Sequence, residues 1–274
     1  METISVLGCG WLGLPLARYL IEKGYDVKGS TRTPTELEVM RASGIEPFYL
    51  VLDPDLRGDN LDDFFKSDVI VINFPPERRP DIVDYHRDQI NALLPRLGNS
   101  PAGKVIFASS TSVYPELNRE VSEDEEALPA KPSGLALMEA ERLLQGCPEF
   151  ETTVIRFGGL IGYDRRPGRF LAGKKEIANG DSPVNLIHRD DCIAIILKII
   201  EKSVWGETFN ACADSHPKRK DYYTAQAGKL GLEPPVFNKS GQSSYKIVTS
   251  DKLKRLLGYE FIYPDPSSID DGQK

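Results

Sequence analysis

The chain has 274 residues, with 34 Lys and Arg against 41 Asp and Glu, so its formal net charge is −7. Hydrophobic residues make up 40% and charged residues 27%, which is typical of a folded globular chain rather than a disordered one. A chain of this length can bury a sizeable core without disulfide or metal staples. The acidic balance argues against a nucleic-acid-binding surface, which requires a basic patch, so we expect no nucleic-acid partner.

The sequence also limits where the protein is expected to work. Its longest apolar stretches fall well short of the roughly 18–20 residues that span a bilayer, so we expect no membrane segment. Residues 1–8 open directly into a strand pattern without a basic region or a cleavage site, which predicts no signal peptide. The four cysteines are widely spaced and form no CxxC pair, which predicts reduced thiols, no metal site and a cytoplasmic protein.

Short apolar runs alternate with amphipathic stretches of helical length over the first 160 residues. The expected strands are 3–7, 26–30, 47–52, 68–73, 104–108 and 152–156. The expected helices lie near 11–23, 34–43, 60–66, 80–97 and 134–145. Apolar strands without clean alternation, separated by helices, are typical of a parallel sheet covered on both faces. We therefore predict an α/β fold with a Rossmann-like, doubly wound parallel sheet, which binds ligands at the carboxyl ends of its strands.

The pattern loosens after residue 160. A loop rich in glycine and basic residues precedes a second series of elements: a helix at 190–202, a strand at 207–211, a helix near 218–230, a strand at 245–249 and a helix at 250–257. We expect residues 1–160 to form the main domain. Residues 161–274 would complete its sheet and build a small C-terminal α/β lobe over the ligand cleft.

The strongest motif is a glycine-rich turn, GxGxxG, between the first strand and the first helix. Gly8 permits a tight turn, Gly10 lets the backbone approach a pyrophosphate, and Gly13 allows the helix to pack closely on the sheet. The motif in this context makes 1–160 a dinucleotide-binding domain, although a merely tight turn stays an alternative. Cys9 is either a small spacer or a thiol whose pKa the helix start lowers. The predicted cofactor contacts of the turn are Gly8, Gly10, Trp11, Leu12 and Gly13.

The end of the second strand bears on the choice of cofactor. An NAD-specific site places Asp or Glu there to hold the ribose 2′-hydroxyl. This chain instead has Ser30, Thr31 and Arg32, while Asp26 lies too early, at the start of the strand. Because a guanidinium can bind a 2′-phosphate through two hydrogen bonds, we predict NADP, with NAD as the second choice. The alternative is that Arg32 is an ordinary solvated loop residue.

Polar and small residues also end the third and fourth strands. Asp53 closes the third strand, and Asn73, Phe74 and Pro75 close the fourth. Both ends fall on the rim of the sheet where an adenine and its ribose would lie. Asp53 is equally well interpreted as an exposed loop acid.

Together these residues resemble the extended short-chain dehydrogenase/reductase superfamily, the group that contains nucleotide-sugar epimerases and dehydratases. The resemblance covers nearly the whole chain and extends to residues 107–114, 156–162 and 185–191. It implies that Ser110 hydrogen-bonds the reacting oxygen of the substrate and that Ser109 contacts the cofactor. It also suggests a homodimer formed through the helices near 80–97 and 134–145. For Ser110, a polar turn at a strand end is the alternative.

The chain departs from that superfamily at its catalytic pair. The family pattern Tyr-x-x-x-Lys would fall on Ser133 and Leu137. Leucine cannot bind a ribose hydroxyl, and an isolated serine is far too weak an acid to replace an activated phenol. The chain is therefore more similar to an atypical, epimerase/dehydratase-like branch that lacks the pair, a branch that residues 167–173, 216–223 and 256–264 also fit.

Three other side chains are candidates for binding a small-molecule substrate. Tyr114 lies at the expected cleft rim, and His188 precedes the helix at 190–202. His188 has a suitable unperturbed pKa for proton transfer, but a histidine that bonds backbone at a helix entry is the favoured alternative. Arg169 belongs to a basic loop that matches a phosphate or carboxylate, against the alternative of a solvated charge run.

Two functions follow from these observations. The first is an NAD(P)-binding oxidoreductase or epimerase/dehydratase-like enzyme that acts on a small polar substrate, such as a nucleotide-linked sugar. The second is a non-catalytic NADP(H)-binding protein that senses the redox state of the cofactor. The glycine turn supports both, the loss of Tyr and Lys favours the second, and Ser110 with the basic loop favours the first.

Overall fold

The computed structural model describes residues 2–238 and 244–269. Its strands are β1 (Thr3–Leu7), β2 (Asp26–Thr31), β3 (Glu46–Asp53), β4 (Asp55–Gly58), β5 (Val69–Ile72), β6 (Lys104–Ser110), β7 (Glu120–Val121), β8 (Glu151–Phe157), β9 (Gly159–Ile161), β10 (Leu186–His188), β11 (Thr208–Ala211) and β12 (Ile247–Val248). Its α-helices are α1 (Gly13–Glu22), α2 (Glu36–Ala42), α3 (Leu61–Phe65), α4 (Ile82–Gly98), α5 (Pro132–Gln145), α6 (Gly168–Leu171), α7 (Arg189–Lys202), α8 (Arg219–Lys229) and α9 (Asp251–Leu257).

A large, mostly parallel sheet brings together eight strands that lie between residues 3 and 211. Its strand order is β11-β8-β6-β5-β1-β2-β3-β4, so β1 lies between β2 and β5. Both neighbours run parallel to β1, and β4 pairs antiparallel with β3 at the edge. The predicted Rossmann-like α/β fold is confirmed. The β4 edge strand was not predicted, because its short polar sequence lacks an apolar pattern and it turns back from β3 through Pro54 alone.

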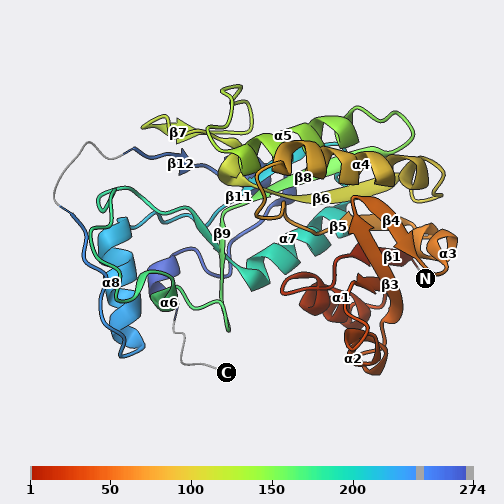
Figure 1. The fold of residues 1–274 in the computed structure, drawn as a ribbon, viewed down its shortest axis with the longest axis horizontal. Helices are drawn as coiled ribbons and strands as arrows, with labels where there is room; N and C mark the ends of the chain where they lie inside the picture. Colours follow the sequence, from red (N-terminus) through yellow and green to blue (C-terminus); the bar gives the residue numbers. More distant parts are fainter. Residues whose placement is uncertain (1, 239–243, 270–274) are drawn as a thin grey trace. The chain divides into compact units, whose positions relative to one another are not determined.

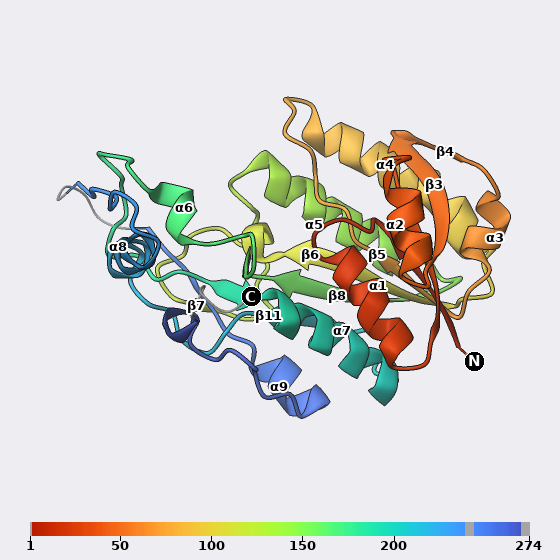
Figure 2. The same ribbon diagram turned by 90° about the horizontal axis from the view of Figure 1, so that it is seen from below.

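Apolar side chains explain why these segments pair and are covered by helices. All four residues of β5 are buried, as expected for a strand with helices on both faces. In α1 the buried residues Leu16, Ala17 and Leu20 form one stripe along the helix. Figure 1 and Figure 2 show α4 and α5 on one face of the sheet, and α1 with residues 193–202 of α7 on the other. The sheet is therefore doubly wound.

Contacts divide the chain into two units built from interleaved segments. Unit 1 comprises Met1–Val113, Pro129–Arg156 and Ile193–Phe209, and unit 2 comprises Tyr114–Leu128, Phe157–Cys192 and Asn210–Lys274. Unit 1 holds the glycine turn and most of the large sheet. Unit 2 contains the two small parallel pairs β9–β10 and β7–β12. A domain boundary at residue 160 stays a prediction.

A buried polar cluster joins three elements of unit 1. The Glu141 carboxylate, on α5, is 3% exposed and accepts three guanidinium hydrogen bonds from Arg156 of β8, at 2.7–3.2 Å. The Ser109 hydroxyl, on β6, donates to Glu141 Oε1 at 2.5 Å. Because the guanidinium and the carboxylate face each other and are hydrogen-bonded, their interaction offsets the cost of burying the two charged groups.

Removing the carboxylate tests this cluster. We expect Glu141→Ala to lower the free energy of unfolding by about 3–5 kcal/mol, because it removes the carboxylate that pairs with the largely buried guanidinium of Arg156. Ser109→Ala removes one hydrogen bond to the carboxylate and should cost less, about 1.5–3 kcal/mol. Urea denaturation measures both. Equal losses in the two variants would contradict the assignment of Glu141 as the centre of the cluster.

Candidate functional site

The register of the sheet places the glycine turn between the ends of β2 and β5. The Gly8 N–H donates to Ser30 Oγ at 3.0 Å, and the Cys9 N–H donates to the Ser30 carbonyl at 2.8 Å. On the other side, Asn73 Nδ2 donates to the Gly8 carbonyl at 2.9 Å. Gly8 has a φ of +104°, a backbone conformation that side-chain-bearing residues rarely adopt. Two neighbouring strands therefore hold the turn in one conformation.

The other two glycines of the motif have different surroundings. A Cβ at Gly13 would collide with the carbonyl of Gly8 and would lie 2.9 Å from the Asn73 amide. A Cβ at Gly10 would meet no atom of the described chain within 4 Å. Gly13 is thus required by close packing of the helix on the turn. Gly10 instead faces open space, where packing within the protein does not require glycine.

That open space belongs to a cavity of about 370 Å³ in unit 1. The ends of β1, β2, β3 and β5 line it, together with residues of the following loops, of the start of α2 and of the middle of α4. Its lining residues are Leu7, Gly8, Cys9, Gly10, Ser30, Thr31, Arg32, Thr33, Glu36, Leu50, Leu52, Asn73, Phe74, Pro75, Pro76, Glu77 and Gln89. This volume falls in the range of small-molecule sites.

The cavity brings together most of the residues predicted for the cofactor. Those that line it are Gly8, Gly10, Ser30, Thr31, Arg32, Asn73, Phe74 and Pro75. Within the described chain, the remaining predicted contacts of unit 1 are not among its lining residues: Trp11, Leu12, Gly13, Asp53 and Ser109. Sequence reasoning missed Glu36 and Glu77, which lie beyond the strand ends where an acid was sought, and Gln89, which lies on a helix.

Three charged side chains line the cavity. Arg32 Nη1 lies 3.1 Å from Glu77 Oε1, and the two side chains are 76% and 41% exposed. Glu36, at the start of α2, accepts a hydrogen bond of 2.5 Å from the Thr31 hydroxyl. The Thr31 hydroxyl in turn accepts from the Thr33 N–H at 3.1 Å. The guanidinium of Arg32, directly after β2, and the hydrogen-bonded carboxylate of Glu36, at the start of α2, therefore line the same cavity.

Cys9 behaves as a packed thiol. It is 5% exposed, and burial raises the pKa of its thiol to about 12. The alternative of a pKa lowered by the helix start is therefore wrong. The desolvation of the thiolate outweighs the hydrogen bond from the Ser30 segment.

The β3 end of the cavity is held by residues of α4. The Tyr85 hydroxyl donates to Asp53 Oδ1 at 2.6 Å, and burial together with this bond raises the pKa of Tyr85 to about 12. Gln89 Nε2 donates to the Leu52 carbonyl at 2.8 Å. The other amide atom of Gln89, Oε1, lies 3.1 Å from Nδ1 of the buried His86 ring. Burial lowers the pKa of His86. Hydrogen bonds from α4 thus hold the end of β3, through Tyr85 to Asp53 and through Gln89 to Leu52.

Ser110 is the last residue of β6 and is partly buried. Its Oγ accepts a hydrogen bond of 3.2 Å from the Ser112 N–H. Ser133 and Leu137, where the Tyr and Lys of the superfamily would fall, both lie in the first half of α5. Ser133 is exposed, whereas Leu137 is 4% exposed and belongs to the core. The alignment of these two residues with the catalytic pair stays a prediction.

The remaining predicted residues belong to unit 2. Tyr114 is buried, and its hydroxyl donates to Asn210 Oδ1 at 2.8 Å. His188 is 5% exposed, its Nδ1 accepts the Asp190 N–H at 3.2 Å, and its ring centroid lies 4.0 Å from that of Tyr263. Arg169 is exposed on the short helix α6. His188 thus has the backbone bond of a helix-entry residue.

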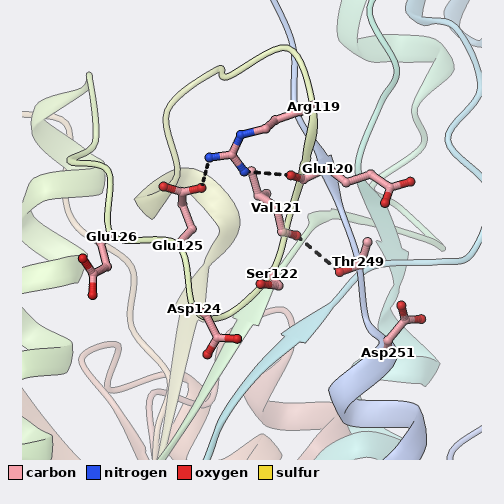
Figure 3. A pocket seen from close by; sticks show the side chains of 9 residues that line it. All are labelled: Arg119, Glu120, Val121, Ser122, Asp124, Glu125, Glu126, Thr249 and Asp251. Carbon is pink, nitrogen blue, oxygen red and sulfur yellow. Dashed lines mark hydrogen bonds and ion pairs between the residues drawn. The ribbon is translucent and has the colours of Figure 1, made fainter.

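Unit 2 also contains a hollow with acidic walls, of about 570 Å³. Figure 3 shows Arg119 beside Glu125, to which it donates at 2.6 Å, while Asp124, Glu126 and Asp251 contribute further carboxylates. Among the described residues, no group of three or more His, Cys, Asp and Glu side chains is placed to hold a metal ion. No described helix is long and apolar enough to cross a membrane.

Comparison with known proteins gives a family match over most of the chain. Residues 4–212 match the model of the NAD-dependent epimerase/dehydratase family. The protein YeeZ of Escherichia coli strain K12 is 36% identical over 97% of this chain and 98% of its own length.

Two solved structures share the fold. A UDP-glucose 4-epimerase from Thermotoga maritima, with UDP-glucose, superposes with a TM-score of 0.79 at 19% identity, over 95% of this chain and 94% of that one. A short-chain dehydrogenase/reductase superfamily protein from Agrobacterium tumefaciens, with bound NAD, has a TM-score of 0.76 at 21% identity, over 95% and 92%. Both support the fold expected from the sequence.

Alanine at Gly10 and Gly13 separates the two roles assigned to these glycines. Gly13→Ala should lower the midpoint of urea unfolding strongly, because its Cβ displaces the Gly8 carbonyl. Gly10→Ala should leave the free energy of unfolding within about 1 kcal/mol of that of the natural protein, since its Cβ enters open space. A comparable destabilisation by Gly10→Ala would mean that packing, and not a ligand, accounts for glycine there.

Proposed function

Because the chain belongs to the NAD-dependent epimerase/dehydratase family, we propose that the cavity of unit 1 binds a nicotinamide dinucleotide, NADP(H) in preference to NAD(H). The single observation that carries this proposal is the turn at Gly10. Gly10 faces a cavity with open space where a side chain would stand, and Gly8 beside it is held rigidly by two strands. A backbone shaped in this way can approach a pyrophosphate closely.

The preference for NADP(H) rests on Arg32. Its guanidinium lines the cavity at the end of β2, is largely exposed, and makes a single-atom ion pair with Glu77. A guanidinium with unused donors can bind a 2′-phosphate through two parallel hydrogen bonds. Glu36 is the opposing influence, because a carboxylate near the ribose suits the 2′-hydroxyl of NAD(H). We place Arg32 first since Glu36 already accepts the Thr31 hydroxyl.

The proposed reaction is hydride transfer between the nicotinamide ring and a small polar substrate, such as a nucleotide-linked sugar. Ser110 is the candidate catalytic residue. Its oxygen accepts the Ser112 N–H, while no described residue accepts its hydroxyl hydrogen. The hydroxyl can therefore donate to a substrate oxygen on which charge develops. Arg169, Tyr114 and His188 stay our candidates for substrate contacts, as a homodimer through α4 and α5 stays our expectation.

A specific observation favours a second candidate, a protein that binds NADP(H) without turnover. Leu137 is buried in the core of unit 1 at the position assigned to the catalytic lysine, and Ser133 occupies the position assigned to the tyrosine. Neither side chain supplies an acid of suitable pKa or an ammonium for the ribose. Under this alternative the protein reports the redox state of the cofactor to a partner.

Transfer of deuterium from 4-deuterated NADPH distinguishes the two candidates. Under single-turnover conditions with aldehydes, ketones and nucleotide sugars, we expect label in the product. Ser110→Ala should slow the transfer by about tenfold or more, equivalent to about 1.4 kcal/mol in the barrier. Ser112→Ala is the matched control, because it keeps the N–H that bonds Ser110.

Transfer that depends on Ser110 but not on the Ser112 side chain would exclude the binding protein without turnover. Tight binding of NADPH with no transfer to any of these substrates would favour it instead. Equal slowing by Ser110→Ala and Ser112→Ala would contradict the role given to the Ser110 hydroxyl.

A further inference from the structure

The Arg32–Glu77 ion pair links two loops on opposite sides of the glycine turn. Arg32 directly follows β2, and Glu77 lies in the loop after β5. Because β1 lies between β2 and β5, the turn at Gly8–Gly13 sits between these two loops. Both members of the pair line the cavity, so the pair joins two of its walls.

We propose that Glu77 determines cofactor specificity by competing with a 2′-phosphate for the guanidinium of Arg32. This inference rests on the proposed function, since it concerns the same dinucleotide site. A cofactor without the 2′-phosphate leaves the pair intact. A cofactor with it draws the guanidinium away from Glu77, and its phosphate then lies near a carboxylate that has lost part of its pairing.

The geometry of the pair makes such an exchange feasible. Only one distance, 3.1 Å between Nη1 and Oε1, joins the two groups, although a guanidinium carries five N–H donors. Both side chains are substantially exposed, so water can solvate the Glu77 carboxylate when it is displaced. Exposed pairs of this kind are weak, and a phosphate bound through two hydrogen bonds can replace the carboxylate.

The charges of the cavity explain why Glu77 should matter more for the phosphorylated cofactor. Its charged lining side chains are one cation, Arg32, and two anions, Glu36 and Glu77. Glu36 is held by the Thr31 hydroxyl and stays in place. With Glu77 present, a doubly charged 2′-phosphate therefore meets more negative than positive charge. Removing the charge of Glu77 leaves one cation, Arg32, and one anion, Glu36. Binding of a cofactor with a neutral 2′-hydroxyl should change much less.

The test compares dissociation constants for NADPH and NADH by cofactor fluorescence. Glu77→Gln keeps the shape of the side chain and removes its charge. We expect it to tighten NADPH binding by about fivefold and to change NADH binding by less than about twofold, with a gain that shrinks as salt rises. Glu38→Gln is the matched control: Glu38 is an exposed acid of α2, outside the cavity, whose partner is Arg41. It should change neither constant.

Further variants separate this inference from the proposed function. In an Arg32→Ala background, the gain from Glu77→Gln should fall to less than half. An equal gain for both cofactors, or an undiminished gain without Arg32, would overturn the competition. If NADPH binds, and Arg32→Ala weakens it while Glu77→Gln changes nothing, this inference alone fails. If neither cofactor binds any variant, the proposed function fails and the inference with it.

Discussion

The site depends on the close approach of Gly13 to the carbonyl of Gly8. There is no room for a Cβ between them, and the Asn73 amide fills the remaining space by donating to the same carbonyl. From the other side, Ser30 binds the turn through both its hydroxyl and its carbonyl. The start of α1 is thereby fixed against β2 and β5. Gly10 of the same turn faces a cavity, and packing within the described chain does not require a glycine there.

Charge is the second constraint on this site. A dinucleotide brings a negatively charged pyrophosphate, and NADP(H) adds a 2′-phosphate, yet the cavity of this acidic protein has two carboxylates and one guanidinium. Helix and turn N–H groups can serve the pyrophosphate. Among the charged residues that line the cavity, Arg32 is the one that could bind the 2′-phosphate of NADP(H) in the proposed site. In the proposed site, discrimination between the two cofactors would therefore depend on which acidic side chains surround that arginine.

Much of the fold could be predicted because its signals are local. The apolar β5 and the glycine turn between β1 and α1 are apparent in short stretches of sequence, and the parallel sheet follows from their alternation. The β4 strand could not be found, because its four residues carry no apolar pattern and pair only with their own neighbour β3. The family match and the solved structures agree with the predicted class.

The residues that line the cavity were predicted in part, for a similar reason. Arg32 and Asn73 immediately follow strands, so the position of the strand end places them. Glu36 enters the cavity from the next helix, and Glu77 from four residues beyond Asn73, where loop geometry decides which way the chain turns. The pKa of the Cys9 thiol is set by its burial against Gly29. The position of Cys9 at a helix start does not indicate that burial.

We propose the cavity of unit 1 as a dinucleotide site with a preference for the 2′-phosphate. This assignment is tested most directly by titrating the purified protein with NADPH and, separately, with NADH, following cofactor fluorescence. We predict saturable binding of NADPH that is clearly tighter than that of NADH. Absence of binding for both would contradict this assignment, and would mean that the scaffold and its glycine turn serve another purpose.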